Sequence, residues 1–189
     1  MEFPNNYTMP THITSASKYA NTQVRCLGDT ASTWASAAGT GSVQWLVPLS
    51  LPVPYLIASF FVCFGTSPGT GVFECGIFTA PSIANNTLNK IMGTASTACV
   101  NTSGNVQIVV PSGGSKLLSA GNYYMGYVST GTNAIISKAL TGLHWANASG
   151  ILLGPTASTL STCSGTYLDV NLNTYKFPLF GVSRLDSGY

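Results

Sequence analysis

The sequence carries very little charge. Asp, Glu, Lys and Arg make up 6% of its 189 residues and give a formal net charge of +2, whereas ordinary globular proteins contain about 25% charged residues. The seven basic residues are scattered singly, so no basic patch indicates a nucleic-acid partner. Hydrophobic residues make up 45% of the chain, which excludes the composition of a disordered protein. A surface with so little charge is poorly protected against self-association, and we expect a homo-oligomer.

Groups that commonly carry out catalysis are also scarce. The chain has five carboxylate side chains and two histidines, and it contains no G-x-S-x-G sequence. No His, Cys, Asp or Glu residues cluster at metal-ligand spacing. The stretches GTGSV and PSGGSK lack the spacing of a phosphate-binding loop and indicate turns instead. We therefore predict that the protein is not an enzyme and binds neither a cofactor nor a metal.

Closely spaced cysteine pairs are missing too. The five cysteines, at positions 26, 63, 75, 99 and 163, include no C-x-x-C. The N-terminal stretch MEFPNNYTMP has neither the basic nor the apolar region of a signal peptide. An odd number of cysteines in a chain without an export signal predicts free, buried thiols.

One long uncharged run, LVPLSLPVPYLIASFFVCFG (46–65), has the length of a membrane span. Pro48, Pro52 and Pro54 each remove a backbone donor and disrupt a helix, and the rest is too short to cross a bilayer. We therefore expect no membrane insertion. The run is rich in aromatic and β-branched residues, and the turn sequence GTSPGTG and a second apolar run, VFECGIF, follow it. This order predicts a β-hairpin.

The predicted hairpin has its centre near Gly69 and makes specific cross-strand pairs. It places Cys63 opposite Cys75, Phe61 opposite Ile77, and Phe60 opposite Phe78. Two neighbouring thiols are expected at the cysteine pair, with a disulfide as the alternative in an oxidising medium.

Both faces of the first hairpin strand are apolar, because alternate side chains point to opposite sides. One face covers the core, and the other needs a loop or a neighbouring subunit as a second cover. The candidate subunit-interface residues are Phe60, Val62, Phe64, Phe78, Tyr123 and Tyr127.

The remaining apolar runs are short and separated by Gly, Ser, Thr and Asn turns. They predict strands at 42–52, 105–112, 120–131, 133–140 and 174–185, with Pro48 at a sheet edge or a bulge. Tyr123, Met125 and Tyr127 fall on one face of their strand. A helical turn is predicted within 81–93, and long loops with one or two short strands within 144–173. This pattern indicates an all-β sandwich or barrel.

The chain shows no internal repeat and no linker. We therefore predict one β-sandwich domain, 31–189, preceded by an N-terminal arm or edge strand, 1–30, that serves in docking.

The segment LHWANAS (143–149) is a candidate sugar-binding loop. Carbohydrate sites often combine an aromatic ring with amide and hydroxyl groups, and His144, Trp145 and Asn147 supply this combination. The alternative is that Trp145 fills an edge of the core, since Trp is mostly buried. Trp34 and Trp45 lie beside strand-like runs and are expected to be core or interface anchors.

The order of several segments resembles a β-sandwich module of tailed-bacteriophage virion proteins. The matching segments are TWASAAGTGSVQWLVPLSLPVPYLIASFFVCFG (33–65), CGIFTA (75–80), MGTAST (92–97) and LLSAGNYYMGYVS (117–129). The resemblance covers residues 33–140 and is one of pattern. It departs from the module at Phe78, where a Tyr is usual, and at APSIANN (80–86), where an acidic turn is common.

The resemblance implies a jelly-roll-like antiparallel β-sandwich in a tail fibre, head fibre or capsid decoration, located in the virion and often forming a homotrimer. Its partners would be copies of itself and other virion proteins of the capsid or tail. The alternative function is a receptor-binding fibre tip or carbohydrate-binding module that recognises host surface glycans.

Overall fold

The computed structural model describes only part of the chain: residues 19–21, 35–38, 44–63, 71–79, 87–100, 106–130, 134–139, 152–154, 159–161, 163–164, 166–167, 176–178 and 180–184. Within these residues the backbone forms strands and no helix. Their strand pairs are antiparallel, including those at the centre of each main sheet. The predicted all-β, antiparallel class is therefore confirmed. No helix in the described part of the chain has the length and apolar character needed to cross a membrane.

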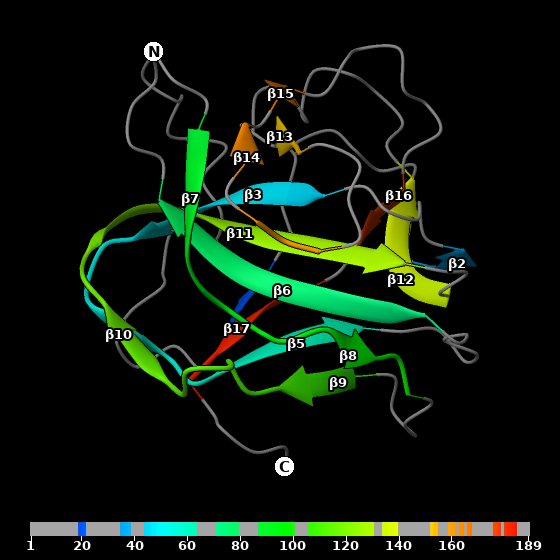
Figure 1. Cartoon of the computed structure of the whole chain (residues 1–189), viewed down its shortest axis with the longest axis horizontal. Helices are drawn as coiled ribbons and strands as arrows, with labels where there is room; N and C mark the ends of the chain where they lie inside the picture. The colour runs from blue at the N-terminus through cyan, green and yellow to red at the C-terminus, as the bar shows by residue number, and fades with distance from the viewer. Residues whose placement is uncertain are drawn as a thin grey trace.

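Two main sheets form the body of the molecule. The four-stranded sheet has the order β1 (Tyr19–Asn21), β17 (Phe180–Ser183), β5 (Ser59–Cys63) and β9 (Val106–Val109). The eight-stranded sheet has the order β14 (Cys163–Ser164), β7 (Thr87–Gly93), β6 (Val72–Thr79), β11 (Gly121–Thr130), β3 (Trp45–Leu51), β13 (Leu152–Leu153) and β15 (Thr166–Tyr167), and β8 (Thr97–Ala98) also pairs with β6. In Figure 1, β3, β11 and β6 run side by side above β5, β9 and β17.

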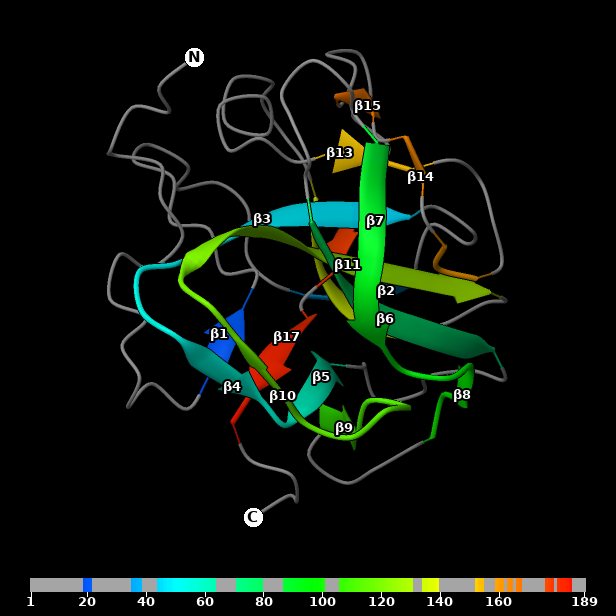
Figure 2. The same ribbon diagram turned by 60° about the vertical axis from the view of Figure 1, so that its left-hand side comes forward.

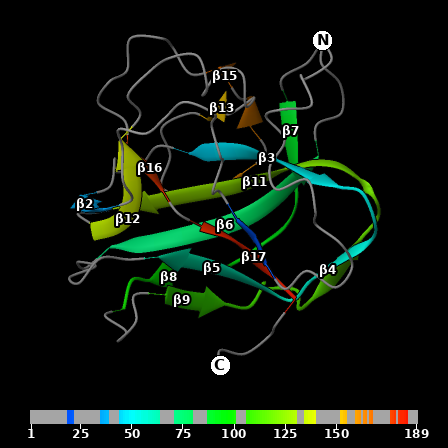
Figure 3. The same ribbon diagram turned by 180° about the vertical axis from the view of Figure 1, so that it is seen from behind.

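Two smaller sheets lie at opposite ends of this body. One pairs β10 (Lys116–Leu118) with β4 (Tyr55–Ile57), and the other has the order β16 (Lys176–Pro178), β12 (Ala134–Ala139) and β2 (Ala35–Ala38). The front and back views both place these sheets at opposite ends of β6 and β11 (Figures 1 and 3).

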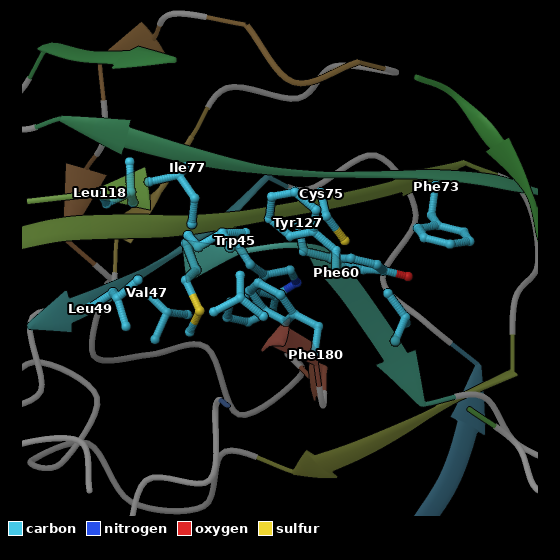
Figure 4. Packing of buried hydrophobic residues seen from close by; sticks show 14 of the residues in the cluster. Trp45, Val47, Leu49, Phe60, Phe73, Cys75, Ile77, Leu118, Tyr127 and Phe180 are labelled. Carbon is cyan, nitrogen blue, oxygen red and sulfur yellow. The ribbon is translucent and has the colours of Figure 1, made fainter. Parts of the chain in front are cut away.

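Side chains from the inner faces of the two main sheets meet in one apolar core. Trp45 and Tyr127 of the eight-stranded sheet belong to the same buried cluster as Phe60 and Phe180 of the four-stranded sheet (Figure 4). The ring centres of Tyr127 and Phe180 are 5.3 Å apart. Each buried aromatic ring removes about 150–250 Å² from water, so these rings dominate the stabilisation of the sandwich. The shared core shows that the two sheets are the two layers of the predicted β-sandwich.

The centre of the outer face of the eight-stranded sheet is also apolar and buried. Its side chains form a second, smaller cluster that includes Leu46, Phe78 and Val128, with Leu152 and Leu160 packed onto them. Gly126 lies at the centre of this face, where a Cβ atom would collide with the Phe78 ring. Because Gly126 has no side chain, the Phe78 ring can occupy this space.

The predicted hairpin between β5 and β6 is wrong. β5 pairs with β17 and β9, whereas β6 pairs with β11 and β7, so the two runs lie in different sheets. The cross-strand pairs expected at Phe60, Phe61 and Cys63 therefore do not form. Two apolar runs joined by a turn can pair with each other or enter opposite layers of a sandwich, and the local sequence does not distinguish these outcomes.

The other strand predictions are largely confirmed. A strand lies within the described part of each of the five predicted ranges, although β9 ends at Val109 and the range 174–185 contains two strands, β16 and β17. Pro48 pairs with Tyr124 of β11, and the described residues on the other side of β3 pair with Trp45 and Leu46 alone, which agrees with the expected edge position of Pro48. The predicted helical turn is wrong for Thr87–Gly93, which is strand β7; residues 81–86 lie outside the described residues.

The region 144–173 has three two-residue strands in its described part, one more than predicted. Within the predicted arm, Tyr19–Asn21 forms an edge strand of the four-stranded sheet by pairing with β17. The rest of 1–30 lies outside the described residues, and the boundary at residue 31 stays a prediction.

Replacement of Gly126 by Ala is expected to destabilise the fold. The added Cβ would meet the fully buried Phe78 ring and come within 3.4 Å of Leu46 Cδ2, and overpacking of this kind costs about 1–3 kcal/mol. Urea unfolding should show this loss. Gly113→Ala is the matched control, because a Cβ there meets nothing within 4 Å. Equal stability of the two variants would contradict the packing described for Phe78.

Candidate functional site

The three candidate sugar-binding residues, His144, Trp145 and Asn147, lie outside the described residues, as does Trp34. The sugar-binding loop therefore stays a prediction. Trp45, by contrast, is 1% exposed and belongs to the inner core. Of its two expected roles, core anchor and interface anchor, the first is confirmed.

The candidate interface residues lie mostly inside the chain. Phe60, Val62, Phe78 and Tyr127 are at most 1% exposed within a single chain, so these four side chains have no surface left for a neighbouring subunit. Tyr123 is half-buried, and its hydroxyl donates a hydrogen bond to the Ser119 carbonyl at 3.0 Å. Phe64 lies outside the described residues.

Both faces of β5 are dry, as the alternation of its side chains predicted. Phe60 and Val62 enter the inner core, and Phe61 points to the opposite face. Phe61 is nevertheless only 8% exposed. A partner chain is therefore not needed to cover either face of this strand at Phe60–Val62.

Cys75 is a free, buried thiol. Its cross-strand neighbour on β11 is Tyr127, and β5 lies in the other sheet, so the expected pairing with Cys63 is wrong. Cys99 is also free and buried, in agreement with the predicted unpaired thiols.

A partly buried ion pair lies on the outer face of β6. Glu74 is 7% exposed, and its Oε2 atom is 3.7 Å from Nζ of Lys90 on the adjacent strand β7. The same oxygen accepts a hydrogen bond from the Leu160 backbone N–H at 2.9 Å. Lys90 Nζ donates to the Leu160 carbonyl oxygen at 3.0 Å. Both main-chain polar groups of Leu160 are therefore held by opposite charges.

Two glycines make the space in which the Lys90 side chain lies. Gly76 and Gly93 are opposite each other on β6 and β7. A Cβ on Gly76 would come within 3.3 Å of Lys90 Cε, and one on Gly93 would meet Lys90 and the Cys75 carbonyl at 2.6 Å. Side chains at these positions would displace Lys90 from the sheet surface, so the glycines allow it to reach Leu160.

A β-bulge in β7 fixes which face Lys90 occupies. Phe78 pairs with Lys90 and Ile77 pairs with Met92, so Ile91 is the extra residue. Ile91 and Met92 both pack against the inner core, while Lys90 stays on the outer face beside Glu74. Because of the bulge, three consecutive residues serve both faces of the sheet: Ile91 and Met92 contact the inner core, and Lys90 carries its charge on the outer face.

The residues that Glu74 and Lys90 hold are part of a cover over the outer face. We define the cover as residues 152–154 and 159–161. Leu152 pairs with Leu46 of β3, and Figures 1 and 2 both show β13 beside one end of β3. The Gly154 N–H donates to the Gln44 carbonyl oxygen at 2.9 Å, and Gln44 Nε2 donates to the Thr159 carbonyl oxygen at 3.3 Å. The cover is therefore fastened mainly through its own backbone.

Glu74 and Lys90 together bind the main chain of one residue, Leu160, in the cover. A carboxylate accepts from one N–H, an ammonium donates to the carbonyl of the same residue, and the Leu160 side chain enters the outer apolar cluster. No group of three or more His, Cys, Asp or Glu side chains within the described ranges is placed to hold a metal ion.

The inner core contains two thiols and two phenol groups whose burial favours the neutral form. Burial raises the pKa of the Cys75 thiol far above its usual range, with Lys90 opposing and Glu74 reinforcing the rise to a lesser extent. Burial likewise raises the pKa of the Tyr127 hydroxyl, which makes no well-formed hydrogen bond with the described residues; interaction with Ser129 offsets only part of the rise. Burial raises the pKa of Cys99 to about 11 and that of Tyr55 to about 12.

Sequence reasoning missed the Glu74–Lys90 pair. Glu74 is the single charge in VFECGIF, and Lys90 is the single charge in TLNKIMG. A lone charge within an apolar strand is a usable signal, because burial of a charge requires a partner. The partner could not be assigned, because the β6–β7 pairing and its bulge were not predicted.

No known protein-family model matches the chain, and no curated protein matches it.

Stability should fall at alkaline pH because of the buried thiols and phenols. Cys75, Cys99, Tyr55 and Tyr127 have raised pKa values in the folded state, so the unfolded chain releases these protons first as pH rises above the ordinary thiol value of 9.0. Each such group adds up to about 1.4 kcal/mol per pH unit to the decline in unfolding free energy once the pH exceeds its unfolded-state pKa, the thiols first near 9.0 and the phenols next near 10.0. Urea unfolding under reducing conditions between pH 7.5 and 10.5 would measure the slope.

Cys75→Ala provides the control for this prediction. It should lower stability at every pH through lost packing, and it should also make the alkaline decline shallower. A wild-type unfolding free energy that stays level to pH 10.5 would contradict the burial of these groups.

Proposed function

We propose that this chain is a non-enzymatic structural subunit of a phage virion, a surface decoration or fibre component that assembles with copies of itself and docks on the capsid or tail. The virion assignment is supported by the resemblance of residues 33–140 to β-sandwich modules of tailed bacteriophages. The all-β, antiparallel sandwich agrees with such a module. The same resemblance supports a trimer.

The observation that carries the assembly part of the proposal is a set of exposed apolar side chains. Val100, Val110 and Leu117 are 45%, 50% and 65% exposed, and they are the exposed large hydrophobic residues of the described part of the chain. Val100 lies beside β9, because its backbone N–H donates to the Gln107 side chain at 3.1 Å. Val110 directly follows β9, and Leu117 belongs to β10.

These three side chains lie in a part of the chain with little charge of its own. Lys116 is the single charged residue between Val100 and Leu117, and its ammonium donates to the Ile91 carbonyl at 3.2 Å. Exposed apolar groups with few charges around them favour contact with another protein surface. We therefore place the subunit contact around β9 and β10, in place of the strand faces that the core already covers.

The oligomeric state tests this proposal. Light scattering at micromolar concentration should give three times the 19.7 kDa mass of one chain. Leu117→Lys should lower the apparent mass, because it places a charge at the proposed contact. Asn122→Lys, which adds the same charge at an exposed position on β11, should leave the mass unchanged. A monomer at these concentrations would count against assembly of the chain on its own.

The virion assignment needs a separate measurement. Density for this chain on the outside of an intact particle would support it. A purified oligomer whose chain is missing from the particles of its source would overturn the virion assignment and leave the oligomer in place.

A further inference from the structure

The cover is held by contacts of a different kind from those that hold the two main sheets together. Leu152 and Leu160 are its contributions to the outer apolar cluster. Its other attachments among the described residues are the two-residue pairings of β13 with β3 and with β15 and the hydrogen bonds to Gln44, Glu74 and Lys90. The sheets, by contrast, share a core of buried aromatic rings. Of the described side chains, separation of the cover therefore exposes fewer apolar ones than separation of the sheets.

The ion pair changes the balance further. Burial takes solvent away from two charges, and their mutual attraction only partly compensates for this loss. Glu74 and Lys90 would regain water if the cover left, since the side chains are 9% and 24% exposed while it is in place. Hydration of the two charges thus offsets part of the loss of the bonds to Leu160, which lowers the cost of local opening relative to global unfolding.

We propose that the cover opens as a unit while the β-sandwich stays folded, and that Glu74 and Lys90 form the latch that sets how often it opens. In the closed state the carboxylate and the ammonium hold the two main-chain groups of Leu160. In the open state the outer face of the eight-stranded sheet, with Leu46, Phe78 and Val128, becomes accessible to solvent. The proposal is independent of the virion assignment and of the contact around β9 and β10.

Amide hydrogen exchange of the intact wild-type chain tests local opening. The Leu160 and Gly154 amides report on the cover because both donate hydrogen bonds that fasten it. The Ile77 amide, in the centrally placed strand β6, serves as the reference. We expect the protection factors of Leu160 and Gly154 to be at least about 100-fold below that of Ile77. Equal protection of all three amides would overturn the proposal.

Substitution of the latch tests the role of the ion pair. Lys90→Met keeps most of the aliphatic chain that lies over Gly76 and Gly93 and leaves the Glu74 charge without its partner. We expect exchange at Leu160 and Gly154 to rise by at least about tenfold, with exchange at Ile77 unchanged. Lys116→Met is the matched control, because it removes an ammonium that also donates to a main-chain carbonyl but does not contact the cover.

A second variant keeps the test decisive if Lys90→Met does not fold. Glu74→Gln preserves the shape of the side chain and removes its charge, and it should raise exchange at the same two amides. Acceleration at Leu160, Gly154 and Ile77 by one common factor would show that the pair stabilises the whole fold, and would overturn its assignment as a latch.

Discussion

The constraint on which this structure depends is that the centre of the eight-stranded sheet is buried on both faces. Strand β6 shows it most directly: Phe73, Cys75 and Ile77 enter the inner core, while Glu74 and Phe78 are buried on the opposite face. A sheet with two apolar faces needs two covers. The four-stranded sheet supplies one, and residues 152–154 and 159–161 contribute to the other. The chain therefore buries within itself surfaces that its sequence alone could equally assign to a partner.

The two covers differ in how they are built, and the scarcity of charge makes this difference informative. The inner cover is a sheet whose side chains interlock with aromatic rings, whereas the outer cover is backbone held by a carboxylate, an ammonium and an amide. In a chain with 6% charged residues, two of the charged side chains, Glu74 and Lys90, lie next to each other beneath this cover. Polar fastening gives direction to the contact, but it stabilises less than the same area of apolar packing, because the desolvated charges lose water.

The strands could be predicted from the sequence, but their partners could not. Alternation of side chains identifies β3 and β11 as strands. The large apolar residues of each strand lie on one face, Trp45 among those of β3 and Tyr127 among those of β11. It does not reveal that β5 pairs with β17, near the other end of the chain, because pairing over such separations depends on the whole core. The helical turn predicted for the β7 segment was wrong. The extra residue of the bulge at Ile91 disrupts the two-residue alternation of side chains by which β7 could be recognised as a strand. The same bulge concealed the Glu74–Lys90 pair.

Internal burial of both faces changes the physical basis for assembly. The sequence favoured an oligomer because its charge is low and because the second apolar strand face needs a loop or a sister chain as a cover, but Phe60, Val62 and Phe78 are covered within one chain. The described residues suggest two routes for the proposed assembly. Contact through Val100, Val110 and Leu117 uses surface that is already exposed and needs no rearrangement. Contact through the outer sheet face would require the cover to leave first, so its strength would follow the state of the Glu74–Lys90 pair. Assembly that responds to Leu117 but not to Lys90 would identify the first route, and the reverse response would identify the second.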